Sequence, residues 1–274
     1  NDFSFRENGE VKHFDFAYIT IHGTPGEDGR LQGYFDMIGM PYSSCNQLVS
    51  ALTFNKFVCN NYLHSFGINV SDSIRLFRGQ TVTDEEVVGR LGLPVFVKPN
   101  DGGSSFGVTK VKEVSQLQPA IAKAFAEGNE VILESFISGT EVTCGCYKVG
   151  GGPEAARKEV VFPLTEVVTK NEFFDFNAKY NGESDEITPA RISPELTEKV
   201  QREASKIYDI LGAKGLIRVD FIIEADGKPK MLEVNTTPGM TATSFIPQQV
   251  RAAGLDIKEV MTDIIENELQ KVGK

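Results

Sequence analysis

The pair Asp226-Gly227, which separates two segments of alternating apolar residues, constrains the fold of this chain more than any other feature. An Asp-Gly pair in such a setting strongly favours a two-residue hairpin turn. We therefore predict that residues 216–225 and 228–235 are antiparallel strands joined by this turn. The turn also fixes the register, so each residue of the first strand has a defined partner on the second.

Two carboxylates face each other in this register. Asp220 is predicted opposite Glu233, in a non-hydrogen-bonded pair with α-carbons about 4.5 Å apart, and Arg218 opposite Asn235 on the same face. Directly opposed carboxylates repel each other unless a positive charge lies between them. Carboxylate and amide oxygens suit Mg²⁺, which bridges substrate phosphates. We therefore predict a cation site of Asp220, Glu233 and Asn235, with a solvated polar face as the alternative.

A glycine-rich segment, Lys-Pro-Asn-Asp-Gly-Gly-Ser-Ser-Phe-Gly at residues 98–107, is a second candidate site. Lys98 ends a predicted strand at residues 94–98, and the glycine amides and serine hydroxyls that follow can donate to an anion. The segment is not a Walker A loop, because its lysine precedes the glycines and no Gly-Lys-Ser/Thr follows. We interpret it as a phosphate-binding loop, with an ordinary flexible turn as the alternative.

An apolar strand at residues 130–137 breaks at a short connector before a second strand at residues 141–149. Such a break resembles a hinge at which a purine bonds to backbone groups while a carboxylate accepts the ribose hydroxyls. An edge strand that carries surface glutamates is the simpler interpretation of the pattern alone.

Composition limits the class of protein. The chain has 274 residues, with 28 Lys and Arg against 38 Asp and Glu, a formal net charge of −10. So acidic a chain repels phosphodiester backbones and anionic membranes, which argues against nucleic-acid and membrane partners. No window approaches about 18 uninterrupted apolar residues and no signal peptide opens the chain, so we expect a cytoplasmic enzyme. The four cysteines do not form a zinc pattern or a disulfide framework, so we expect buried thiols.

Strands and helices alternate along the chain, which predicts an α/β fold of two or three domains. Helices are predicted at residues 31–38, 56–66, 83–92, from a cap at Ser115 to Gly128, at 193–211 and from 256 onward. Further strands are predicted at residues 16–21 and 159–168, with an irregular polar stretch at 171–190. The first strand and helix have no neighbours to complete a parallel sheet, so we expect an N-terminal part of this domain to be absent.

Taken in order, these motifs resemble those of the ATP-grasp superfamily, and most closely those of the D-alanine:D-alanine ligases. The resemblance covers essentially the whole chain. It rests on His22-Gly23 through Gly26-Glu27-Asp28-Gly29, Lys98-Pro99 through Gly103-Ser104-Ser105, Glu134 with Glu141, Phe174-Asp175 through Ala178-Lys179-Tyr180, Arg218-Val219-Asp220 and Leu232-Glu233-Val234-Asn235-Thr236-Thr237-Pro238-Gly239-Met240-Thr241. The implied fold is an α/β ATP-grasp fold, two α+β subdomains that clasp ATP, preceded by a partial Rossmann-like N-terminal domain. The implied domains are residues 1–55, 56–140 and 141–274.

The resemblance implies an ATP-dependent ligase that joins two D-alanines. In that family ATP phosphorylates the carboxylate of one D-alanine, and the amine of the second attacks the acyl phosphate. The products are D-alanyl-D-alanine for peptidoglycan synthesis, ADP and phosphate. ATP and two Mg²⁺ or Mn²⁺ ions are the implied cofactors, and a homodimer is the implied assembly. Two alternatives stay open: another ATP-grasp carboxylate ligase with an amine or D-lactate acceptor, and a nucleotide-binding module without turnover.

The resemblance also assigns roles to individual residues. The implied ATP contacts are Lys56, Lys98, Gly103, Ser104, Ser105, Glu134, Ser135, Phe136, Ile137, Glu141 and Lys179. The implied metal ligands are Asp220, Glu233 and Asn235. The implied substrate contacts are His22, Ser244 and Phe245. The implied catalytic groups are Arg218 and the Gly239 N–H at the acyl oxygen, Ser104 at the transferred phosphoryl group, and Tyr180.

The polar stretch at residues 171–190 is implied to be a lid that carries Lys179 and Tyr180 and keeps water from an acyl phosphate. Tyr180 is the family feature associated with amine rather than hydroxy-acid acceptors. Ordinary alternatives exist for His22, which can bond its own loop, and for Lys56, which can be a solvated helix residue. Family members also carry an earlier glycine-rich loop whose Ser and Glu contact the first D-alanine. Nothing before His22 fills that role, so without such a segment we expect nucleotide binding but no efficient turnover.

Overall fold

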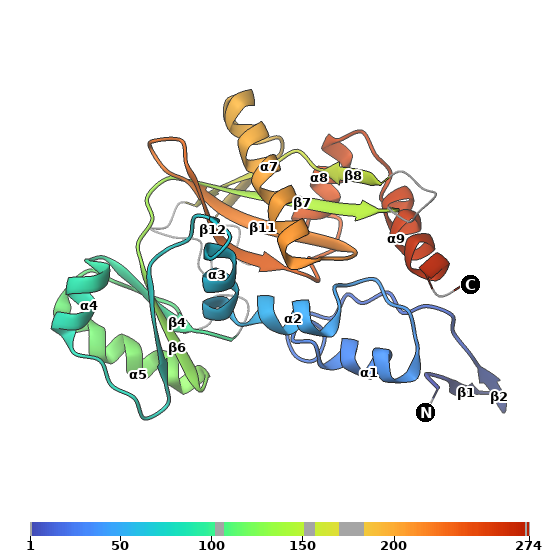
Figure 1. The fold of residues 1–274 in the computed structure, drawn as a ribbon, viewed down its shortest axis with the longest axis horizontal. Helices are drawn as coiled ribbons and strands as arrows, with labels where there is room; N and C mark the ends of the chain where they lie inside the picture. The colour runs from blue at the N-terminus through green and yellow to red at the C-terminus, as the bar shows by residue number, and fades with distance from the viewer. Residues whose placement is uncertain (1, 102–106, 151–156, 170–183, 272, 274) are drawn as a thin grey trace.

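The computed structural model describes residues 2–101, 107–150, 157–169, 184–271 and 273. These residues contain an N-terminal hairpin, a four-stranded sheet and a six-stranded sheet. The smaller sheet lies at the left of Figure 1, the larger one lies above and to the right, and helix α3 lies between them. Within the described residues, no helix is long and apolar enough to cross a membrane.

The N-terminal region is mostly irregular. Its elements are β1 (Phe5–Glu7), β2 (Glu10–Lys12), α1 (Arg30–Ile38) and α2 (Gln47–Phe54). The predicted helix at residues 31–38 is confirmed, and it ends at Gly39, whose φ of 68° favours a residue without a side chain. The predicted strand at residues 16–21 is wrong, because the only pairing there is an isolated bridge between Ala17 and Tyr42. One bridge does not build the hydrogen-bond ladder that a strand requires.

The four-stranded sheet is antiparallel throughout. Its order is β3 (Ser73–Phe77), β6 (Glu130–Ser135), β4 (Val95–Pro99), β5 (Thr109–Val111). Helices α4 (Asp84–Leu91) and α5 (Leu117–Glu127) cover it, and their Val87 and Ala124 are fully buried in its core. The predicted cap at Ser115 is wrong. A capping box between Glu113 and Gln116 opens a short 3-10 turn, Val114–Gln116, before α5 begins.

Helix α3 (Lys56–His64) links the two sheets. It is two residues shorter than predicted, and the Asn55 side chain caps its start by accepting from the Val58 N–H. Its Cys59 and Leu63 are buried in the core of the larger sheet. The helix therefore packs on the six-stranded sheet, although its first residue directly contacts the end of β4. The division into residues 1–55, 56–140 and 141–274 stays a prediction.

The six-stranded sheet carries the C-terminal half of the fold. Its path is β10 (Ser184–Ile187), β9 (Thr165–Thr169), β7 (Thr140–Val149), β11 (Leu216–Ile223), β12 (Pro229–Asn235), and β8 (Lys158–Val161) pairs with the end of β7. The single strand predicted at residues 159–168 is wrong, because Pro163, which has no N–H to donate, separates β8 from β9. Part of the predicted irregular stretch is also ordered, as β10.

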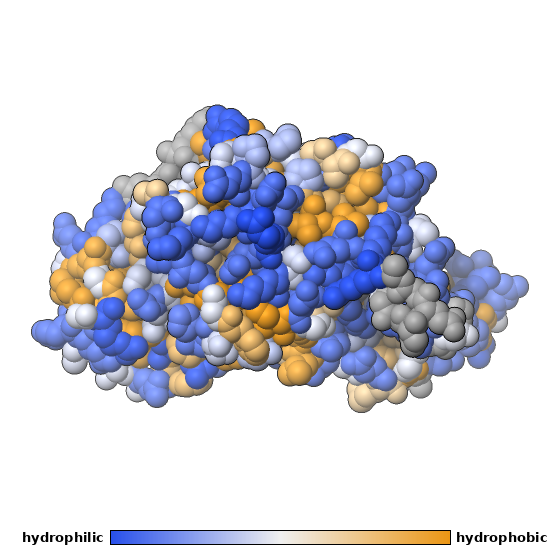
Figure 2. Space-filling model, turned by 45° about the horizontal axis from the view of Figure 1, so that its top comes forward, coloured by the Kyte–Doolittle hydropathy of each residue, from blue (hydrophilic) through white to orange (hydrophobic). Residues whose placement is uncertain are grey.

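The two faces of this sheet differ in chemistry. On one face, helix α7 (Pro194–Leu211) buries Val200 and Ile207 against Cys144 and Val219, while the surface over α7 is mostly hydrophilic (Figure 2). The other face carries helices α8 (Phe245–Ala252) and α9 (Ile257–Lys271) together with Arg218 and the carboxylates. The prediction of buried thiols is confirmed for all four cysteines, which are Cys45, Cys59, Cys144 and Cys146.

The predicted hairpin forms, but its turn is longer than expected. Gly227 N–H donates to Glu224 O and Glu224 N–H donates to Lys228 O, so the loop has three residues instead of two. The longer turn shifts the register by one residue near the loop. An extra residue in β12, Leu232, shifts it back, because Phe221 pairs with Met231 while Asp220 pairs with Glu233. The bulge therefore restores the predicted register at the candidate site.

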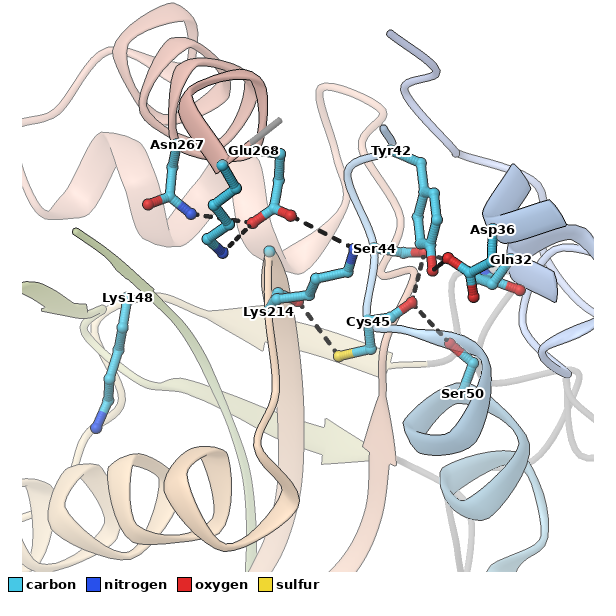
Figure 3. Close-up of polar contacts among 12 residues, drawn as sticks. Gln32, Asp36, Tyr42, Ser44, Cys45, Ser50, Lys148, Lys214, Asn267 and Glu268 are labelled. Carbon is cyan, nitrogen blue, oxygen red and sulfur yellow. Dashed lines mark hydrogen bonds and ion pairs between the residues drawn. The ribbon is translucent and has the colours of Figure 1, made fainter. Parts of the chain in front are cut away.

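Polar contacts hold the N-terminal region against the larger sheet (Figure 3). Lys214, just before β11, has its Nζ 3.9 Å from the centre of the Tyr42 ring and 3.4 Å from Glu268 Oε2 on α9. The Cys45 thiol donates to the Lys214 carbonyl oxygen at 3.3 Å. Next to it, Gly215 has a φ of +67°, and a Cβ added there would lie 1.9 Å from Ser43 O.

We predict that Gly215→Ala destabilises the protein by about 2–4 kcal/mol, because it combines a left-handed backbone with a clash against main chain. Gly254→Ala is the matched control. Gly254 has a φ of +71° but nothing within 4 Å of an added Cβ. Urea denaturation followed by circular dichroism measures both effects. Equal losses in the two variants would contradict a role for the close approach of Gly215 to Ser43.

Candidate active site

Two opposed carboxylates lie at the centre of the candidate site. Asp220 on β11 pairs with Glu233 on β12 and with Thr143 on β7, so the three side chains share one face. Thr143 Oγ1 donates to Asp220 Oδ1 at 2.5 Å. Asn235 Nδ2 lies 3.4 Å from Asp220 Oδ2 and 3.5 Å from Glu233 Oε1. The structure thus brings together the three side chains that the sequence predicted as a cation site.

The donor set of this site fits Mg²⁺. Two carboxylates and an amide offer only oxygen ligands, which is the preference of a hard divalent cation. Within the described residues there is no group of three or more His, Cys, Asp or Glu that could hold a metal ion by itself. A cation here would therefore complete its ligands with water and substrate phosphate oxygens, as Mg²⁺ usually does.

Arg218 lies on the same face of the sheet as Asp220, two residues before it on β11. Its Nε and Nη2 donate to Asp220 Oδ1 and Oδ2 at 2.9 and 2.8 Å, a bidentate pair. The Phe245 ring packs against the guanidinium, with 5.1 Å from Cζ to the ring centre. Burial opposes the charge on Arg218, but Asp220, together with Glu233 and Glu27, raises its pKa. Arg218 therefore stays cationic at every working pH.

Two lysines that lie outside the larger sheet each contact a glutamate near the candidate site. Lys56 Nζ, at the start of α3, lies 3.9 Å from Glu233 Oε2. Lys98 Nζ, on β4, lies 2.5 Å from Glu134 Oε2 on the neighbouring strand β6. Burial opposes the charge on Lys98, but Glu134 and then Glu233 raise its pKa. Both lysines are therefore positioned to meet an anion held between the two sheets.

The connector predicted as a nucleobase hinge follows β6. The Ser135 N–H donates to Asp72 O and the Phe136 N–H donates to Pro94 O, both within the protein. Ile137 is buried, and Glu141 enters β7 on the same face as Asp220. The connector thus lies beside the Lys98–Glu134 pair, as the resemblance implies.

The predicted substrate contacts come from three separate segments. His22 Nδ1 lies 3.4 Å from Glu27 Oε1, while Glu27 Oε2 accepts from the Gly23 N–H at 2.6 Å. A Cβ added at Gly239 would lie 2.8 Å from Ser244 Oγ and 3.8 Å from His22 Nε2. The structure therefore brings His22, Gly239 and Ser244 together, with Phe245 as the first residue of α8.

Several predicted site residues lie outside the described residues. These are Gly103, Ser104 and Ser105 of the glycine-rich segment and Lys179 and Tyr180 of the proposed lid. Their roles stay predictions.

Sequence reasoning missed two supporting residues. Thr143 bonds Asp220. Its place on the site face could have been predicted, because it lies two residues after Glu141 and strand residues two apart share a face. Glu27 was noted only as part of a motif, yet it bonds the His22 loop and adds to the field at Arg218. No local pattern identifies such a contact.

Two sheets with Lys56, Lys98, Asp220 and Glu233 between them are the arrangement expected of an ATP-grasp enzyme. The model of the D-ala D-ala ligase C-terminus matches residues 62–266, and that of the D-ala D-ala ligase N-terminus matches residues 1–45. The chain belongs to the D-alanine--D-alanine ligase family.

Individual relatives agree with this placement. The D-alanine--D-alanine ligase of Parabacteroides distasonis is 80% identical over 270 residues, which are 98% of this chain and 80% of the relative. The VanG D-Ala:D-Ser ligase from Enterococcus faecalis superposes with a TM-score of 0.83 at 34% identity, covering 94% of this chain and 74% of that one. A D-alanine--D-alanine ligase from Bacillus anthracis complexed with ATP gives 0.79 at 32% identity, covering 93% and 79%.

Proposed function

We propose that this chain catalyses the ATP-dependent joining of two D-alanines to D-alanyl-D-alanine for peptidoglycan synthesis. The observation that carries the proposal is the meeting of Lys56 and Lys98 with Arg218, Asp220 and Glu233 between the two sheets. A carboxylate that attacks ATP needs its own charge and that of the phosphates neutralised, and these residues supply that environment. The 80% identity to a D-alanine--D-alanine ligase supports the same reaction.

In the first step, a D-alanine carboxylate oxygen bonds to the γ-phosphorus of ATP and the bond to the β-phosphate oxygen breaks, which releases ADP. Lys56 and Lys98 neutralise the phosphates, and Ser104 with the glycine-loop amides holds the transferred phosphoryl group. Asp220, Glu233 and Asn235 would hold Mg²⁺ or Mn²⁺, two ions, which neutralise phosphate charge. Residues 171–183, the part of the predicted lid that lies outside the described residues, would keep water from the acyl phosphate.

In the second step, the neutral amine of the other D-alanine attacks the acyl carbon, the bond from that carbon to the phosphate oxygen breaks, and the nitrogen loses a proton to water as the amide forms. Negative charge develops on the acyl oxygen, where Arg218 and the Gly239 N–H donate to it. Asp220 grips the guanidinium at two points, so the donors are held in place before the charge appears. Ser244 and the Phe245 N–H bind the acceptor carboxylate at the start of α8, and His22 contacts substrate from the opposite loop.

The adenine lies along the connector of residues 135–137, beside Glu134, with Glu141 on the ribose. The donor in this connector is the Ile137 N–H, because the Ser135 and Phe136 N–H groups already donate within the protein. Lys179 completes the phosphate contacts. Because ATP is an intracellular nucleotide, we place the enzyme in the cytoplasm, and we propose a homodimer.

The acceptor is D-alanine instead of a hydroxy acid, because Tyr180 matches the family feature of amine-using enzymes. The test is product identification by mass spectrometry after the intact enzyme is incubated with ATP, Mg²⁺ and D-alanine, with D-lactate and D-serine as competing acceptors. We expect D-alanyl-D-alanine and phosphate release that depends on D-alanine. A D-serine or D-lactate product would instead identify a different ligase of this fold, and ATP binding without acceptor-dependent phosphate release would identify a nucleotide-binding module.

A further inference from the structure

A fully buried asparagine, Asn100, lies in the glycine-rich segment directly after β4 and contacts helix α3. Its Oδ1 accepts from the Phe57 N–H at 2.8 Å, and its carbonyl oxygen accepts from the Lys56 N–H at 3.4 Å. These are the first two N–H groups of the helix, which have no partner within the helix itself. Asn55 Oδ1 accepts from the third, the Val58 N–H. A residue from just after β4, distant in the sequence, thus completes the cap of α3.

Glu130 holds Asn100 in the orientation that this cap requires. Asn100 Nδ2 donates to Glu130 Oε2 at 2.8 Å, and the Asn100 N–H donates to the Glu130 carbonyl oxygen at 3.0 Å. The same carboxylate oxygen lies 3.7 Å from Arg75 Nη1. The Arg75 guanidinium lies 4.6 Å from the centre of the Phe57 ring. The contacts therefore form a closed ring of four residues at the junction, in which Phe57 takes part through both its N–H and its ring.

This junction connects the two lysines proposed to bind ATP. Lys98 is on β4, two residues before Asn100. Lys56 is the first residue of α3, which packs on the larger sheet, and its Nζ lies near Glu233. Asn100 bonds the start of α3 through two hydrogen bonds just after β4, and Asn55 adds a bridge to Asp101 and a bond from its Nδ2 to Glu130 Oε2 at 3.4 Å. A shift here changes the distance between the two lysines without touching the D-alanine contacts at His22, Gly239 and Ser244.

We propose that Asn100 is a positioning residue for ATP, which sets Lys56 against Lys98 by capping α3 and is itself oriented by Glu130. The inference rests on the proposed phosphate contacts of the two lysines. A misplacement of about 1 Å in a binding group can change an enzyme's rate constants up to about 100-fold. The effect should fall on ATP and not on D-alanine, because only the phosphate-binding side is displaced.

The test uses Asn100→Asp in the intact enzyme. The aspartate keeps an acceptor for the Phe57 N–H, but places a second carboxylate oxygen against Glu130 Oε2. We expect the KM for ATP to rise about tenfold, while the KM for D-alanine and kcat change less than about twofold. Asn100→Asp combined with Glu130→Gln restores a donor–acceptor pair at this contact but gives up the charge that faces Arg75, so the KM for ATP should recover by about threefold or more from that of Asn100→Asp.

Asn129→Asp is the matched control, because it adds the same charge one residue before Glu130, on an exposed side chain whose Oδ1 accepts from Arg78 Nε. This variant should leave the KM for ATP, the KM for D-alanine and kcat unchanged. Equal changes in the KM for ATP and for D-alanine, a fall in melting temperature with no change in the KM for ATP, or failure of the double variant to recover would each overturn the inference.

Lys56→Met separates this inference from the assignment on which it rests. If Lys56→Met raises the KM for ATP and Asn100→Asp does not, the positioning role fails and the lysine assignment stands. If Lys56→Met leaves the KM for ATP unchanged, Lys56 does not bind the phosphates and both fail.

Discussion

Arg218→Lys lowers kcat/KM for dipeptide formation by about 10²–10³-fold, the effect expected when one preorganised donor to a developing oxyanion is lost. The substitution keeps the positive charge, so a fall in kcat/KM reports the lost geometry of the guanidinium hydrogen bonds. The arginine fork donates to both Asp220 oxygens and stacks beside Phe245, and a lysine ammonium cannot reproduce either contact from one point. Steady-state kinetics with D-alanine as the varied substrate measure the change.

Arg191→Lys is the matched control for this experiment. Arg191 makes an equally regular fork to Glu166, with Nε and Nη2 each 2.9 Å from a carboxylate oxygen, but its side chain is 61% exposed and away from the candidate site. We expect less than about a twofold change in kcat/KM, because Glu166 pairs with Val142 and its side chain therefore lies on the sheet face opposite to Thr143 and Asp220. If Arg218→Lys retained activity within fivefold of the parent, Arg218 would not be the group that stabilises the acyl oxygen.

The pairing of Asp220 with Glu233 was predictable from the sequence, although the predicted turn length was wrong. Alternation along residues 216–223 assigns Arg218 and Asp220 to one face whatever the turn length. The turn length itself was wrong, since Glu224 and Lys228 close a three-residue loop. The bulge at Leu232 cancels that error before Glu233 is reached. Local preference at Asp-Gly identified the hairpin, but no local signal reports a bulge five residues away.

Contacts between distant segments were not predictable. Asn100 stands inside a motif that the sequence identified, but its partner, the Phe57 N–H, lies 43 residues earlier. The same holds for Lys56 with Glu233, which depends on α3 packing against β12 and not on any spacing in the chain. Periodicity gives the face of an element, whereas the choice of its neighbour depends on the packing of the whole core.

The failed predictions in the N-terminal region have the same cause. The apolar run at residues 16–21 has the composition of a strand, but a strand forms only where a partner supplies a ladder, and here the partner is one residue, Tyr42. The helix at residues 31–38 was correct because its limits are local. Gly39 ends it through its own backbone conformation.

Lys98→Met abolishes turnover, with a loss of about 10³-fold or more in kcat/KM for ATP, because the phosphates lose a cation held in a buried site. The substitution also removes the cationic partner of Glu134, whose side chain is 8% exposed and keeps a bond from Asn60 Nδ2 at 3.4 Å. Breaking a buried pair by removing one member costs about 3–5 kcal/mol, so a loss of folding would imitate a loss of catalysis.

Lys98→Met combined with Glu134→Gln resolves this ambiguity, because it removes the stranded charge while keeping the shape of both side chains. We expect the double variant to recover most of the melting temperature lost by Lys98→Met but to stay at least about 10²-fold below the parent in turnover. Glu134→Gln alone reports how much the carboxylate contributes to nucleotide binding. Recovery of turnover together with stability in the double variant would show that Lys98 serves the fold by neutralising Glu134, and the phosphate charge would then have to be met by Lys56 and the metal site.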